Sequence, residues 1–305
     1  MKKYFSKVFA LLLGVVVTLI SCNNAEEVIN LEEQGRIETA PVHIQVANFS
    51  MSIDDMPEVP TRAEVTPANY NNVKELTLAF YSGSTEILKE IQVRSDNPTN
   101  YETFGEFTCN LPAGSYTMVV VGRGVFSGDA FSLTSPTLAA YTSDYVSETF
   151  CATQSVTVTT TQALDLSVTL NRIVTLLAIL STDTRPADAA KIRITSSAGN
   201  YSFNPTTGLG TGDPGFTADL TLKSDVGKTI GVGAYAFIAS DELTTDITLD
   251  VLDTNNQVLF RKSIPNVPLK RNRQTTLSGA LFSPSATTAS FTLETDWIPA
   301  ITVTY

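Results

Sequence analysis

Short stretches in which apolar and polar residues alternate constrain the fold of this chain more than any other feature. Four of them carry apolar residues at every second position: Leu76, Leu78 and Phe80; Leu164, Leu166, Val168 and Leu170; Phe216, Ala218, Leu220 and Leu222; Ile247, Leu249 and Val251. Successive side chains of a β-strand point to opposite faces, so each stretch predicts a strand with one apolar and one polar face. Turn-forming residues separate the stretches at intervals of roughly ten residues. The sequence therefore predicts an all-β protein built from sandwiches.

A boundary between two domains is expected at Asn171-Arg172. Alternating stretches run up to Leu170, and a new apolar strand over residues 173–180 begins directly afterwards. Two sandwiches of about 130 residues each fit typical domain sizes better than one sandwich of about 260. We therefore expect an N-terminal domain over residues 41–171 and a C-terminal domain over residues 172–305.

The first residues predict an export signal with a lipid attachment site. Three lysines precede an uncharged apolar run over residues 8–20, too short to span a bilayer as a helix and typical of a signal peptide. The motif Leu19-Ile20-Ser21-Cys22 resembles the lipobox of bacterial lipoproteins, which implies cleavage between Ser21 and Cys22 and a lipid such as palmitate on Cys22. The alternative, a short buried helix with an incidental cysteine, fits the lysines and the small residue at 21 less well. Residues 1–21 are thus expected to be removed.

An acidic tether comes next, and the mature chain as a whole is acidic. Residues 22–40 are polar and include Glu26-Glu27, a pair that resembles the signal sending lipoproteins to the cell-surface side of the outer membrane. Residues 1–21 hold three of the 20 basic and none of the 31 acidic residues, so the mature chain has 17 basic residues, 31 acidic residues and a formal charge of −14. Nucleic acid binding needs basic patches, so we expect no nucleic acid partner.

The remaining cysteines, Cys109 and Cys151, leave two alternatives open. An exported protein meets an oxidising compartment, in which a disulfide can form between them. Cysteine is also a common small core residue, so two buried free thiols are an equal alternative. Both precede Asn171, so we expect them in the same domain.

Four segments resemble the fimbrillins of the Bacteroidales, the subunits and anchors of type V pili. They are Val73-Lys74-Glu75-Leu76-Thr77-Leu78-Ala79-Phe80-Tyr81, Leu111-Pro112-Ala113-Gly114-Ser115-Tyr116-Thr117-Met118-Val119-Val120-Val121, Val168-Thr169-Leu170-Asn171-Arg172-Ile173-Val174 and Val267-Pro268-Leu269-Lys270-Arg271-Asn272-Arg273-Gln274-Thr275-Thr276-Leu277-Ser278-Gly279. The resemblance implies two transthyretin-like β-sandwich domains in tandem. It also implies an adhesive role in a fimbrium, with no enzymatic activity. The basic residues of the last segment are expected to form a solvated turn rather than a ligand site.

The resemblance further implies assembly by strand exchange. Type V pilins are cut after an arginine, the cut removes the first strand, and a strand of a neighbouring subunit fills the groove. Alternation over residues 42–53, with one phase shift, predicts the removable strand. Cleavage is expected between Arg62 and Ala63, next to an exposed proline-containing loop at residues 54–61. Arg36 is a weaker alternative, because a cut there frees no strand.

The C-terminus offers a candidate donor strand, because Ile301, Val303 and Tyr305 alternate with threonines up to the last residue. An ordinary final strand, paired inside its own domain, is the favoured alternative for an anchor subunit. The partners implied are other fimbrial subunits, the outer membrane through the lipid on Cys22, and a host or bacterial surface ligand.

Enzymatic functions find little support in the sequence. The single histidine, His43, lies on the polar face of the first strand, so we expect no catalytic residue, no metal and no cofactor. The rival function is an outer-surface glycan-binding lipoprotein. Such a protein displays aromatic rings on an exposed face, for which Tyr141, Tyr145, Phe150 and Trp297 are the candidates. Exposure of these rings would favour glycan binding, and their burial would favour the fimbrial function.

Overall fold

A computed structural model describes residues 38–53, 61–94, 104–126, 130–142, 145–223, 226–283 and 292–294. The all-β class expected from the sequence is confirmed: these residues form strands arranged in several sheets, with one 3-10 turn, η1 (Pro67–Asn69). No helix within the described residues is long and apolar enough to cross a membrane.

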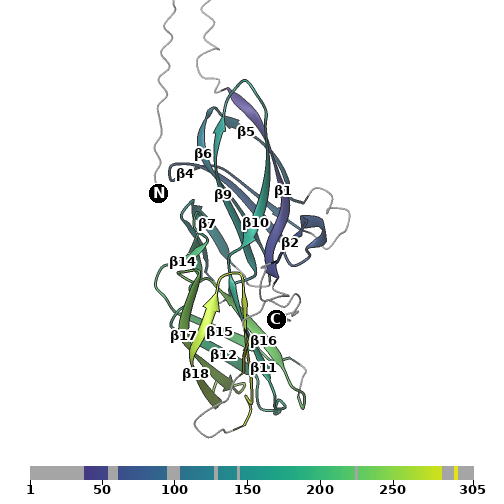
Figure 1. Cartoon of the computed structure of the whole chain (residues 1–305), viewed down its shortest axis with the longest axis vertical. Coiled ribbons are helices and arrows are strands. Elements are labelled where there is room, and N and C mark those ends of the chain that lie inside the picture. Colours follow the sequence, from purple (N-terminus) through teal and green to yellow (C-terminus); the bar gives the residue numbers. More distant parts are fainter. Residues whose placement is uncertain are drawn as a thin grey trace, which may run out of the picture. The chain divides into compact units, whose positions relative to one another are not determined.

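The largest sheet has eight strands and holds most of the N-terminal half (Figure 1). Its order is β2-β1-β10-β9-β6-β3-β4, and β5 also pairs with β1. In that order the strands are β2 (Thr61–Val65), β1 (Thr39–Ile53), β10 (Leu164–Arg172), β9 (Thr149–Val158), β6 (Gly114–Arg123), β3 (Glu75–Ser82) and β4 (Thr85–Val93), with β5 at Glu106–Pro112.

Three four-stranded sheets complete the fold. The first is β16 (Gly231–Ala236), β11 (Thr175–Ser181), β19 (Gln274–Gly279) and β20 (Thr292–Glu294). The second is β15 (Phe216–Thr221), β12 (Lys191–Ser196), β17 (Glu242–Leu252) and β18 (Val258–Lys270). The third is β14 (Leu209–Thr211), β13 (Ser202–Asn204), β8 (Leu138–Tyr141) and β7 (Phe131–Ser135).

Two apolar cores lie against these sheets. The first, here the N-terminal core, contains buried residues from Ala40 to Leu170 only. The second contains residues of both halves, from Ala79 to Phe282. The third small sheet also crosses residue 171, because β13 pairs with β8. Whether Asn171-Arg172 separates two independently folding domains therefore stays a prediction.

The alternation expected for β3 was only half right. Leu76, Leu78 and Phe80 enter the N-terminal core as predicted. The other face is buried as well: Thr77 is 3% exposed, and Tyr81 is fully buried. Its hydroxyl donates to Leu133 O on β7 at 3.4 Å. The small sheet that includes β7 covers this face, so a strand with the pattern of a half-exposed sheet is buried on both sides.

Candidate functional site

The candidate site is strand β1 together with the groove that it fills. On one side β1 runs parallel to β10, from Val42 opposite Leu164 to Ser50 opposite Asn171. On its other side it pairs antiparallel with β5 in its first half and with β2 in its second half. An N-terminal strand thus occupies an interior position of the sheet, where Figure 1 shows it beside β10.

The side chains of β1 fill the N-terminal core as the alternation predicts. Val42, Ile44 and Val46 are at most 2% exposed, whereas the intervening His43 is exposed. The predicted phase shift is a β-bulge after Val46, and beyond it Phe49 is fully buried. Burying one such side chain stabilises a fold by about 1.5–3 kcal/mol. Four of them contribute on the order of 10 kcal/mol, which approaches the whole stability of a typical domain.

Arg62 and Ala63 lie in β2, as does Thr61, which was expected in the loop that precedes the cleavage site. Ser52 pairs with Arg62, and Met51 pairs with Ala63. Residues 61–65 can form a strand here because the pairing of β5 with β1 ends opposite Gln45. The edge of β1 beyond Gln45 is therefore open for β2 to pair with. β2 is the terminal strand of the sheet, and a terminal strand presents one free backbone edge.

A buried polar cluster holds the segment immediately downstream of β2. Tyr70 donates to the Glu148 carboxylate at 2.8 Å, and the Arg172 guanidinium pairs with that carboxylate at 2.5 Å. Burial raises the pKa of the Tyr70 hydroxyl well above its usual range, and the charge of Glu148 adds to this shift. Arg94 donates to Tyr70 O at 2.9 Å and also to Pro67 O. These contacts tie the chain downstream of Ala63 to β9 and β10, in addition to the packing of the Tyr70 ring against Phe49 of β1, with ring centroids 5.8 Å apart.

The sequence alone pointed to neither Tyr70 nor Glu148. The one signal available was a glutamate inside the otherwise uncharged stretch 145–151, which becomes informative only if that stretch is buried. Glu148 is 5% exposed and Arg172 is 3% exposed. A charge at such depth requires a partner, because an isolated charge in an apolar environment is strongly unfavourable.

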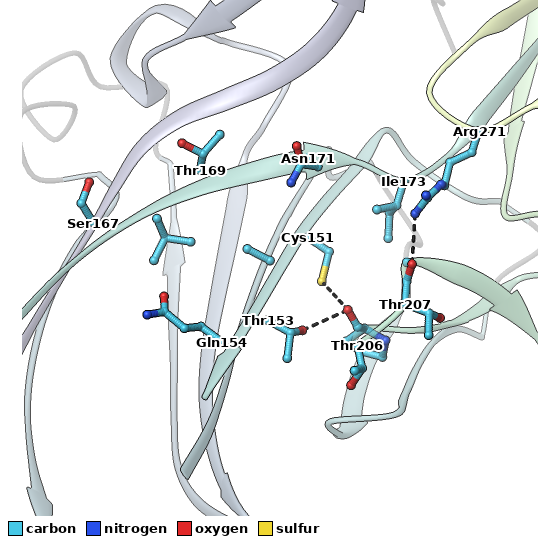
Figure 2. Close-up of a pocket in the computed structure, with 14 residues that line it drawn as sticks. Cys151, Thr153, Gln154, Ser167, Thr169, Asn171, Ile173, Thr206, Thr207 and Arg271 are labelled. Atoms are coloured by element: carbon cyan, nitrogen blue, oxygen red, sulfur yellow. Dashed lines mark hydrogen bonds between the residues drawn. The ribbon is translucent and has the colours of Figure 1, made fainter. Parts of the chain in front are cut away.

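A cavity of about 420 Å³ opens where β9 and β10 part (Figure 2). Residues 151–154 of β9 and residues 167–169 and 171 of β10 form its sides, and residues 205–208 with Arg271 close one end. Cys151 and Thr153 donate to Pro205 O, at 3.6 and 2.9 Å, and so hold the closing loop against β9. Arg271 Nη1 donates to Thr207 O at 3.0 Å, and Nη2 pairs with Asp241. The basic turn expected from the sequence therefore contributes to the wall of a cavity.

Both cysteines of the described residues are buried free thiols. Cys109 on β5 belongs to the N-terminal core, and Cys151 on β9 belongs to the second core. Burial raises the pKa of Cys109 to about 11 and that of Cys151 to about 12. These thiols are protonated at neutral pH, which makes them poor nucleophiles.

Three of the aromatic residues named for glycan binding lie in the described part of the chain, and these three do not form an exposed face. Phe150 is fully buried and Tyr141 is 4% exposed. Tyr145 is half-buried, and its hydroxyl donates to Asp219 O. His43 accepts or donates a hydrogen bond with Thr108 at 2.9 Å on an exposed strand face. Within the described residues no three histidine, cysteine or acidic side chains are placed to hold a metal.

Several predicted features lie outside the described residues. They are the signal peptide with Ser21 and Cys22, the acidic tether up to Ile37, Arg36, most of the loop at residues 54–61, Trp297 and the candidate donor strand at residues 301–305. Each stays a prediction.

The chain is a multi-sheet β protein, and its fold is similar to that of solved bacterial proteins. A candidate adhesin from Bacteroides ovatus matches with a TM-score of 0.50 and 11% identity, over 83% of this chain and 96% of that chain. A second candidate adhesin from Bacteroides ovatus matches at 0.48 and 12% identity, over 81% and 88% of the two chains. The fimbrial anchor protein Mfa2 from Porphyromonas gingivalis matches at 0.44 and 14% identity, over 85% and 98%. The expected resemblance to Bacteroidales adhesive proteins is thus confirmed as a similarity of fold.

The chain belongs to a protein family of unknown function, DUF6562, whose model matches residues 39–298. No curated protein sequence matches the chain.

Proposed function

We propose that this protein is a lipid-anchored, non-enzymatic subunit or anchor of a fimbrium on the outer membrane, and that β1 is its exchangeable strand. Its partners are other fimbrial subunits, which supply the strand that replaces β1, and its role is adhesive. The lipid on Cys22 holds the uncleaved protein at the cell surface.

The observation that carries the proposal is the position of β1. It is the first strand of the described chain, yet it has neighbours on both sides and fills the N-terminal core. The chain leaves β1 through the segment that ends in Arg62, and contacts of Tyr70 hold the residues downstream of β2. A cut after Arg62 therefore breaks the chain connection between β1 and the strands that follow. Of these, β10, β9, β6, β3 and β4 stay joined to one another without β1, whereas β5 has β1 as its sheet neighbour.

The energetics favour replacement of β1 over simple loss. Without it, β10 and β5 present unpaired backbone edges, and an apolar trough opens between them. The lost burial, on the order of 10 kcal/mol, approaches the stability of the domain. Another strand that alternates in the same way restores both the hydrogen bonds and the burial.

The test compares limited trypsin cleavage of the full chain with that of its Arg62→Gln variant. Mass spectrometry establishes which bonds are cut. Oligomers that resist detergent are expected only from the chain cut after Arg62, because only that cut frees β1. A wild-type chain that is cut there, remains monomeric and keeps its β1 fragment would contradict strand exchange at this end.

The N-terminus of the mature surface protein separates the two forms of the proposal. A lipid-modified Cys22 identifies an anchor, whereas a chain that begins at Ala63 identifies a polymerising subunit.

A further inference from the structure

Strands β9 and β10 form a hairpin that is split along most of its length. They are consecutive, and they pair only through Phe150 with Arg172 and Cys151 with Asn171. Continued at the same register, this pairing places Val158 opposite Leu164, the two residues that flank the connection 159–163. The register is therefore that of an ordinary hairpin, but the two strands separate after two residue pairs.

The strands part because they belong to two layers that face the same core. β9 pairs with β6, whereas β10 pairs with β1. Val156 and Val158 of β9, and Val168 and Leu170 of β10, all enter the N-terminal core. Within the described residues, the edges 152–158 and 164–170 that face each other pair with no further strand. We call these two facing edges the β9–β10 fork.

One hydrogen bond between the two strands shows which backbone groups point into the fork. Ile173 N donates to Thr149 O at 3.0 Å, so Thr149 and Ile173 form a hydrogen-bonded pair. Such pairs recur at every second residue of an antiparallel ladder. The odd-numbered residues therefore direct their N–H and C=O groups into the fork; they are Thr153, Ser155 and Thr157 on β9, and Asp165, Ser167 and Thr169 on β10.

We propose that the β9–β10 fork binds an extended polypeptide segment of a partner protein, which pairs with both edges at once. A strand that pairs with both edges needs about 10 Å between them, which equals two strand spacings of about 4.8 Å. The segment is therefore expected to lie beyond the paired residues Cys151 and Asn171, where β9 and β10 separate. The cavity of about 420 Å³ lies at the paired end of the fork (Figure 2). One added strand would extend the pairing of β9 with β10, which now covers two residue pairs, along the rest of the fork.

The side chains of the fork indicate the chemistry of the segment. Its outer rim carries hydroxyl groups in opposing positions, Thr153 with Thr169 and Ser155 with Ser167. Threonine and serine side chains pair well across strands, so threonine or serine is expected at alternate positions of the segment. The positions between them face apolar residues of the core and suit valine or alanine. Asp165 lies at the end next to the connection 159–163, and Arg271 lies at the end where β9 and β10 pair, so a basic residue at one end and an acidic residue at the other complement the fork.

This site does not depend on the proposed cleavage, because β1 is in place while the fork is open. The binding experiment therefore uses the full chain carrying Arg62→Gln, purified in detergent. Two synthetic peptides in which threonine alternates with valine serve as probes, one with lysine first and glutamate last, the other reversed. A third peptide carries N-methyl groups at alternate amides, so it keeps its side chains but cannot pair with a strand.

Binding of at least one of the first two peptides is expected, without binding of the methylated one. Ser155→Pro and Ser167→Pro each remove one N–H group from the fork, whereas Ser155→Ala and Ser167→Ala keep it; both side chains are exposed. Each proline is expected to weaken binding at least about tenfold, which corresponds to about 1.4 kcal/mol, and each alanine, which loses the hydroxyl but keeps the N–H group, by a smaller factor. If a proline variant fails to fold, hydrogen exchange of the chain with an unmutated fork gives a second measure. Binding of the peptide is expected to slow exchange at the amides of Ser155 and Ser167 relative to the peptide-free chain.

The proposal is overturned if neither peptide binds, if the methylated peptide binds equally well, or if prolines on one edge have no effect. Binding of an oligosaccharide that is lost in Gln154→Ala but kept in the proline variants would assign the cavity to a glycan instead.

Discussion

Replacing Ile44 by alanine tests whether β1 contributes to the core as strongly as its burial indicates. Ile44 is 1% exposed and lies opposite Leu166 of β10 and Phe107 of β5. Truncating a buried isoleucine to alanine costs about 2–5 kcal/mol, because the lost burial is accompanied by a cavity. The neighbouring Gln45 is exposed, so Gln45→Ala is a matched control on the same strand, with an expected change within about 0.5 kcal/mol.

Urea unfolding of the uncleaved chain measures both variants. Ile44→Ala is expected to lower the transition midpoint without changing the slope, because the surface exposed on unfolding stays the same. After cleavage at Arg62, the same variant is expected to release its β1 fragment at least about tenfold faster, since about 1.4 kcal/mol corresponds to a factor of ten. Equal stabilities of the Ile44→Ala and Gln45→Ala chains would refute the argument that β1 is a core strand.

Three further predictions concern other parts of the chain. Glu148→Gln removes the carboxylate of a buried ion pair and is expected to cost about 3–5 kcal/mol in thermal unfolding, whereas Glu86→Gln at an exposed pair costs less than about 1 kcal/mol. Burial raises the pKa values of Cys109 and Cys151, so on raising the pH the unfolded chain loses its thiol protons before the folded chain does. The contribution of these thiols to the free energy of unfolding is therefore complete below about pH 9 and is lost as the pH rises towards 11–12. In native Cys22→Ser protein neither thiol should react with an aromatic disulfide reagent at pH 8, and two should react after unfolding. Cys22→Ala is expected to abolish labelling by a radioactive fatty acid, and persistent labelling would exclude the lipobox.

The order of strands along the chain, and which face of each is apolar, could be predicted from the sequence in most places. Alternation located β1, β10, β15 and β17, and the phase shift after Val46 marked a β-bulge. The turn at Arg271 was also predicted, whereas the ion pairs of Lys270 with Glu242 and of Arg271 with Asp241 were not. These features are local, because the direction of a side chain along a strand depends only on its position within that strand.

The sequence by itself thus determined a β protein, the positions of several strands and the apolar face of each of them. Only the tertiary structure decided which strands are neighbours, since pairing depends on residues far apart in the chain. It placed β1 between β10 and β5, buried both faces of β3, and enclosed Glu148 with Tyr70 and Arg172. It also split the β9–β10 hairpin, because the two strands pair with different neighbours around a shared core, and no periodicity within either strand records that choice.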